Sequence, residues 1–155
     1  MAHTVIRLGN PDASPDDIER LLALRMTRQQ ILIQPGAPIL WAVIDEAALR
    51  RLQASSAMRA QVKHLVKMAE LPNVRIQVMP IYFGAHVAVG GPFAILRFSE
   101  PDLPDIVYLE QLTCALYLDK GPDVEHYLMV MDRLCVQAKS PAETARFLND
   151  TLKSL

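Results

Sequence analysis

Apolar and polar positions change their period along the chain, and each change marks a new element. The run 39–44 (ILWAVI) is apolar throughout, which is typical of a strand covered on both faces. In 58–69 apolar residues recur at helical spacing, after a serine at 55 or 56 that can cap a helix, and Pro72 ends the pattern. Positions 74–79 then alternate, as in a half-buried strand. This order predicts two parallel strands joined by a right-handed helical crossover.

Helix signals flank this unit on both sides. Residues 4–8 resemble the tail of a helix, and Ser14, followed by proline and two acids, starts a helix that extends to about Leu32. Toward the other end, Asp123 is predicted to cap a helix that runs to about Lys139. The sequence Ser-Pro-Ala-Glu at 140–143 is a capping box that begins a last helix.

Three further segments complete the predicted sheet. The runs 93–98 (FAILRF) and 105–110 (DIVYLE), separated by a polar turn, predict an antiparallel hairpin. The segment 111–119 (QLTCALYLD) fits either a strand or a short helical turn. The predicted fold class is α/β, with a mixed sheet of about four to five strands, a βαβ unit at its centre, an N-terminal helix and two C-terminal helices.

Composition narrows the class of protein. The 155 residues suit a single domain over 1–155, and half of them are hydrophobic, so a well-formed core is expected. A net charge of −1 argues against DNA binding by this chain alone. Because the chain has no signal peptide and no apolar run long enough for a membrane span, we expect a cytoplasmic protein. The isolated cysteines Cys114 and Cys135 are expected to be reduced thiols.

Motifs for catalysis and for cofactor binding are missing from the sequence. It contains no phosphate loop, no dinucleotide fingerprint and no GxSxG elbow, and its four histidines do not have the spacing of metal ligands. We therefore predict no catalytic residue, no cofactor and no metal site.

Candidate ligand-binding residues lie instead where strands end. Asp45 and Glu46 follow the first strand, at the edge where α/β sheets bind ligands, although acids there also favour the start of the next helix. His86 lies in a glycine-containing loop after the second crossover strand, and Glu110 ends a later strand. These last two could form the acid/base pair of a small hydrolase, which is one alternative function.

Aromatic residues in the strands complete the candidate set. Trp41 and Tyr108, like Tyr117, more often pack in a core at such positions than line a ligand cage. Trp41 and Tyr108 remain candidates. The predicted ligand-binding set therefore contains Trp41, Asp45, Glu46, His86, Tyr108 and Glu110.

Several short blocks in a fixed order resemble one family. They are LRMTRQQIL, PILWAVIDEAALRR, MRAQVKHLVKMAELPNVRIQVMP, GAH with GPFAILRF, and DIVYLEQLTCALYLD, and they extend from about Asn10 to Leu152. The blocks resemble the C-terminal domain, of unknown function, of actinobacterial Xre-family helix-turn-helix transcriptional regulators. This antitoxin-like group includes WhiJ-like proteins. Cys114 departs from the pattern, because a small residue, usually glycine, is expected there.

The resemblance implies a regulatory role. In that family an N-terminal helix-turn-helix domain binds DNA, and this chain, which has no such module, is expected to be the regulatory half. The resemblance implies a homodimer that senses a small ligand or contacts a small companion protein, with DNA bound through the absent N-terminal domain. It assigns no catalytic residue. The positions that match the family's blocks are Arg28, Gln29, Trp41, Asp45, Glu46, Gly84, His86, Phe93, Tyr108, Glu110 and Tyr117. A purely structural interaction module is the remaining alternative.

Overall fold

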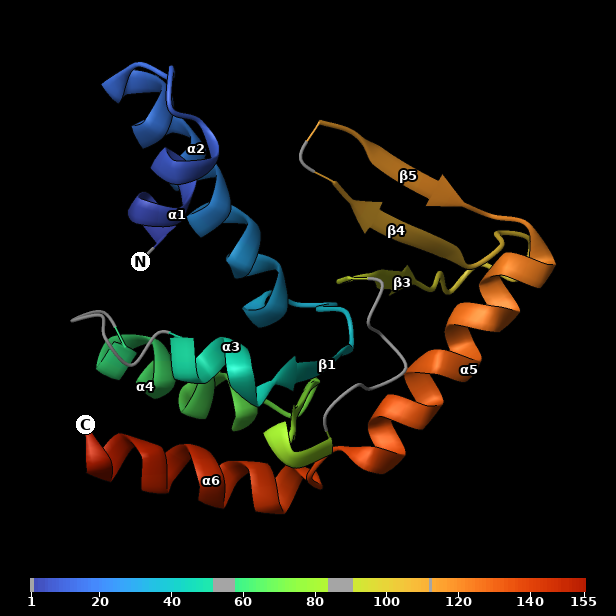
Figure 1. The fold of residues 1–155 in the computed structure, drawn as a ribbon. Coiled ribbons are helices and arrows are strands. Elements are labelled where there is room, and N and C mark those ends of the chain that lie inside the picture. Colours follow the sequence, from blue (N-terminus) through green and yellow to red (C-terminus); the bar gives the residue numbers. More distant parts are fainter. Residues whose placement is uncertain (1, 52–57, 84–90, 112) are drawn as a thin grey trace.

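The computed structural model describes residues 2–51, 58–83, 91–111 and 113–155, which form an α/β fold (Figure 1). Its elements in chain order are α1 (Ala2–Gly9), α2 (Pro15–Gln29), η1 (Gln30–Ile33), β1 (Leu40–Asp45), α3 (Glu46–Arg51), α4 (Met58–Ala69), β2 (Val74–Met79), η2 (Ile81–Phe83), β3 (Ala94–Leu96), β4 (Ile106–Glu110), β5 (Ala115–Leu118), α5 (Gly121–Gln137) and α6 (Pro141–Ser154). The predicted fold class is confirmed. In these parts of the chain, no helix is long and apolar enough to cross a bilayer.

The predicted strand–helix–strand unit is present. β1 and β2 pair in parallel, from Leu40 opposite Val74 to Asp45 opposite Met79. Figure 1 shows α4 lying along α6. Between these elements lies a core cluster in which every side chain is buried: Leu49, Met58, Val62, Val78 and Leu148. The caps predicted at 55 or 56 lie outside the described residues.

The strands divide between two sheets, which corrects the prediction of one mixed sheet. β1 and β2 form the first sheet, and β3, β4 and β5 form a second, antiparallel sheet in that order. Within the segment 111–119, residues Ala115–Leu118 form strand β5, so the strand alternative is confirmed for them. The second edge of β2 is taken by the junction of α5 and α6: the Lys139 N–H donates to the Val78 carbonyl (2.9 Å), and the Val78 N–H donates to Thr144 Oγ1 (3.0 Å). A third strand cannot pair with Val78 because both of its backbone groups are already satisfied.

Helix α5 connects the two sheets. It contacts β4 in one sheet and β2 in the other, and Figure 1 shows it running from one to the other. A second core cluster forms along it, with buried Met79, Val130, Leu134 and Ala138 packed against Val43 and Phe93. Phe93 also contacts Tyr127 of α5, with 5.0 Å between ring centroids.

Three helix starts test the predicted caps. Ser14 caps α2 by accepting a hydrogen bond from the Asp17 N–H, and Ser140 forms the predicted capping box with Glu143. The prediction for Asp123 is wrong, because α5 begins at Gly121 and Asp123 lies in its first turn. Pro122 explains the earlier start, since its fixed φ angle suits the first turn of a helix. Cys114 and Cys135 are free, as predicted.

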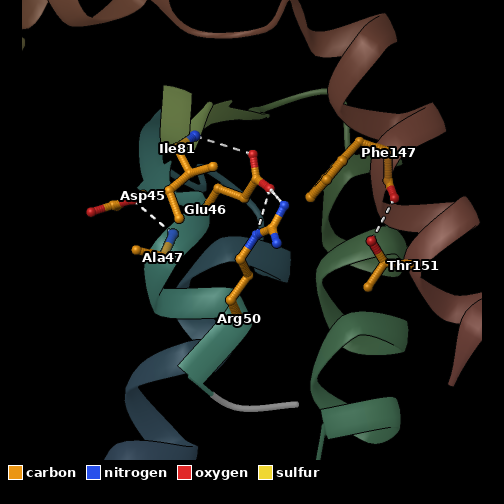
Figure 2. Close-up of polar contacts among 7 residues, drawn as sticks. All are labelled: Asp45, Glu46, Ala47, Arg50, Ile81, Phe147 and Thr151. Carbon is orange, nitrogen blue, oxygen red and sulfur yellow. Dashed lines mark hydrogen bonds and ion pairs between the residues drawn. The ribbon is translucent and has the colours of Figure 1, made fainter. Parts of the chain in front are cut away.

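Removing the hydroxyl group that holds the edge of β2 should destabilise the fold. Thr144 and Val78 are both fully buried, so Thr144→Val leaves the Val78 N–H without its acceptor. We expect the free energy of unfolding, measured with urea, to fall by about 1–3 kcal/mol. The control is Thr151→Val. The hydroxyl of Thr151 is half-buried and donates to the carbonyl of Phe147 on the same helix (Figure 2). A loss no larger than in this control would contradict the role of Thr144.

The capping box of α6 should make stability depend on pH. Hydrogen bonds from the Ser140 hydroxyl and, next, from its backbone N–H hold the pKa of Glu143 below its ordinary value of 4.5. A carboxylate with a lowered pKa stabilises the folded state above its unfolded pKa, and this contribution is lost as pH falls through the folded value. The wild type should therefore exceed Glu143→Gln in urea midpoint at pH 6. The difference should disappear in strong acid, and a difference that persists unchanged there would contradict this origin.

Candidate functional site

The predicted ligand residues that the structure describes do not converge on one point. Trp41 is the second residue of β1 and Asp45 is its last, so their backbones lie about 13 Å apart along an extended strand. Tyr108 and Glu110 belong to β4, in the other sheet. His86 lies outside the described residues, and the hydrolase alternative that pairs it with Glu110 gains no support. The structure brings together two pairs: Asp45 with Glu46, and Tyr108 with Glu110.

Asp45 and Glu46 hold a helix start in place. Glu46 is buried, and its Oε1 accepts hydrogen bonds from Nε (2.8 Å) and Nη2 (2.7 Å) of Arg50. Its Oε2 accepts a bond from the Ile81 N–H (3.2 Å), so one carboxylate ties α3 to the segment after β2 (Figure 2). Asp45 Oδ1 accepts from the Ala47 N–H (2.8 Å), which satisfies a free donor in the first turn of α3. These bonds give both acids a structural role near the start of α3.

Trp41 anchors the two strands to α5. Its indole Nε1 donates to Gln77 Oε1 (2.7 Å), and the guanidinium of Arg75 lies 5.3 Å from the ring centroid. Gln77 is buried, and its amide donates to the carbonyls of Cys135 (3.1 Å) and Lys139 (2.9 Å) near the end of α5. The indole is 47% exposed, so the expectation that Trp41 packs in the core is wrong. It lies at the surface end of a buried polar network.

Tyr108 and Tyr117 form a paired aromatic surface on the three-stranded sheet. They lie directly opposite each other in β4 and β5, with ring centroids 5.1 Å apart. Glu110 is two residues along β4 and shares their face. We call Tyr108, Glu110 and Tyr117 the tyrosine face. Tyr117 is 65% exposed, so the expectation of a core position is wrong for it as well.

A charged residue from a distant part of the sequence, Arg28, affects the tyrosine face. Partial burial raises the pKa of the Tyr108 phenol, and the nearby Glu110 and Tyr117 add to the rise. The guanidinium of Arg28, in the last turn of α2, acts in the opposite direction. A phenol with a raised pKa stays protonated at neutral pH, so Tyr108 is suited to hydrogen bonding rather than to proton abstraction.

Exposed apolar side chains lie on the three-stranded sheet and on α2. On the sheet, Leu96 and Tyr117 are exposed on the side of the tyrosine face, and Leu116 is exposed on the opposite side. On α2 the exposed Leu21 and Leu24 share a side with Arg28 at helical spacing. Further exposed apolar residues follow on and after α2, namely Met26, Ile31 and Ile33. Single exposed apolar residues are ordinary, but groups of this kind mark interaction surfaces. Within the described ranges, no three histidine, cysteine or acidic side chains are close enough to hold a metal ion.

The composition of this surface differs from the predicted ligand set. Tyr117 and Arg28 were outside that set, although both match the family blocks. The strand alternative for 111–119, paired with 105–110, would have placed Tyr117 beside Tyr108, because the register of two paired strands fixes which residues lie opposite each other. Nothing local connects Arg28 to a strand eighty residues later in the sequence.

A comparison with protein-family models identifies the family of this chain. The model of a domain of unknown function, DUF5753, matches residues 1–150. The chain belongs to the DUF5753 family. No match is found among curated proteins or among solved structures.

Glu46 of this DUF5753 chain should contribute to stability rather than to ligand recognition. Glu46→Gln keeps the shape of the side chain but removes a buried charge that accepts three hydrogen bonds. We expect the free energy of unfolding to fall by about 1–3 kcal/mol. Asp150→Asn is the control, because it breaks an exposed ion pair with Lys153 and should cost less than about 0.5 kcal/mol. Equal urea midpoints for Glu46→Gln and the wild type would contradict this assignment.

Proposed function

We propose that this DUF5753 chain is the dimerising regulatory domain of a DNA-binding transcriptional regulator. The regulator would be of the Xre helix-turn-helix family, in the WhiJ-like, actinobacterial group, and would act in the cytoplasm. The sequence blocks that resemble this group support the assignment. The observation that carries it is the group of exposed apolar and aromatic side chains on the three-stranded sheet and on α2.

The net charge of this chain indicates that another part of such a regulator would contact DNA. A net charge of −1 gives this chain little attraction for phosphates, and a helix-turn-helix domain would supply the basic surface. The regulatory domain would set the distance between two such DNA-binding domains. Because helix-turn-helix dimers bind half-sites about one turn of DNA apart, a small change in that distance alters operator affinity.

Regulation would follow from a shift between two arrangements of the dimer. A small ligand or a companion protein can shift this equilibrium only by as much as its affinities for the two arrangements differ. The tyrosine face is the proposed point of contact, since it combines two exposed or half-exposed phenols with a carboxylate, and Arg28 lies near enough to affect Tyr108. It can donate and accept hydrogen bonds while burying aromatic area.

Dimerisation is the first property to measure. We expect sedimentation velocity to show a homodimer across about 1–100 μM protein, because exposed apolar surface of this extent favours association. The control is the same measurement in 1 M salt, which should leave an apolar dimer intact and weaken one held by surface charges. A monomer at tens of micromolar would contradict the proposal.

A further inference from the structure

The two outer strands of the three-stranded sheet differ in how their edges are protected. β3 has three residues, Pro92 precedes it closely, and an ion pair between Arg97 and Asp105 (2.8 Å) lies at its end. β5 is Ala-Leu-Tyr-Leu, with no proline and no charge. Natural proteins shield edge strands with prolines, charges and short lengths, because open edges pair with other strands. Both strands are short, but β3 also has the proline and the ion pair, and β5 has neither.

The backbone groups on the open side of β5 can be assigned. The Gln111 N–H donates to the Cys114 carbonyl (2.9 Å), which makes 111 and 114 a hydrogen-bonded pair. Such pairs alternate along an antiparallel ladder, so Leu109 with Leu116 is the next one. The N–H and C=O groups of Ala115 and Tyr117 therefore point away from β4, toward the open edge.

An apolar side chain marks the same edge. Leu116 lies opposite Leu109, on the face that carries Val107. Val107 is fully buried, whereas Leu116, one strand further out on the same face, is 48% exposed. A leucine on the buried face of a sheet is left exposed at its edge when the neighbouring strand is missing.

We propose that two copies of the chain associate by antiparallel pairing of β5 with β5, which forms one six-stranded sheet. This inference rests on the proposed dimer and names the surface that forms it. A second copy fits because the edge is self-complementary: rotation by 180° brings outward donors opposite outward acceptors. The core face then continues across the axis and covers Leu116.

The assigned backbone directions limit the register, because outward groups must meet outward groups. Of the two-fold arrangements that satisfy this condition, the one centred on Leu116 pairs the whole of 115–117 with its copy. It places Ala115 opposite the partner's Tyr117 and Leu116 opposite the partner's Leu116 on the two-fold axis. Leu116 then forms a non-hydrogen-bonded pair, in which side chains approach most closely. The small Ala115 leaves room for the tyrosine ring. Asp119 lies opposite the partner's Thr113, so like charges do not meet.

Cysteine cross-linking tests this register. In a Cys114→Ser, Cys135→Ala background, Leu116→Cys places two thiols across the axis, where Cα atoms about 4.5 Å apart permit a disulfide. We expect an intermolecular disulfide to form at least tenfold faster than in Leu103→Cys, measured on non-reducing gels under mild oxidation. Leu103 is a matched control for chance collision, because it is 50% exposed in a turn outside the sheet. Faster cross-linking of Tyr117→Cys than of Leu116→Cys would overturn the register.

A charge at the axis gives a second, independent test. Leu116→Lys places two ammonium groups opposite each other and should weaken association at least tenfold in sedimentation, whereas Leu103→Lys should not. Far-ultraviolet circular dichroism of both variants checks that they fold. If the wild type is a dimer but neither Leu116 variant differs from its Leu103 control, the dimer uses another surface and this inference fails alone. If the wild type is a monomer, the proposed dimerisation fails with it.

Discussion

The architecture depends on how the second edge of β2 is closed. Val78 is fully buried near the C-terminal end of that strand, and its N–H and C=O bind Thr144 and Lys139 from the junction of the last two helices. Two residues of β2 thus hold α5 and α6, since Gln77 bonds to the end of α5 as well. Because this edge is occupied, no further strand can pair with β2 at Val78. In the described part of the chain, β3, β4 and β5 form a separate sheet, and α5 contacts both sheets.

Local rules were enough to predict much of the fold. The serine caps at 14 and 140 depend on residues within one helical turn, and the structure shows both. The parallel pair follows from an apolar run, a helix and an alternating run. Asp123 shows the limit of such rules, because Pro122 competes for the same helix start and shifts it one turn earlier. The separation into two sheets could not be predicted, since a hydroxyl 66 positions from Val78 in the sequence acts as the neighbour of a strand.

In the candidate site, too, some features follow from the local sequence and others depend on residues far apart in the chain. Glu46 follows a strand, a position that fits both a ligand site and a helix start, and its bonds to Arg50 and to the Ile81 N–H favour the structural role. The tyrosine pair depends on the register of a hairpin and was within reach of sequence reasoning. The influence of Arg28 on Tyr108 depends on how α2 lies relative to the second sheet. Residues of this surface come from separate parts of the sequence, so its shape depends on the arrangement of several elements rather than on one loop.

Trp41 offers a way to observe such rearrangements directly. It is the sole tryptophan of the chain, half-exposed, with its indole hydrogen-bonded to Gln77 and a guanidinium above its ring. Gln77 in turn holds the end of α5, the helix that connects the two sheets. Indole emission is sensitive to hydrogen bonding and to nearby charge, so the native fluorescence of this protein reports the position of α5 relative to β2. Trp41 thus serves as a built-in fluorescent probe near the end of α5, the helix that contacts both sheets.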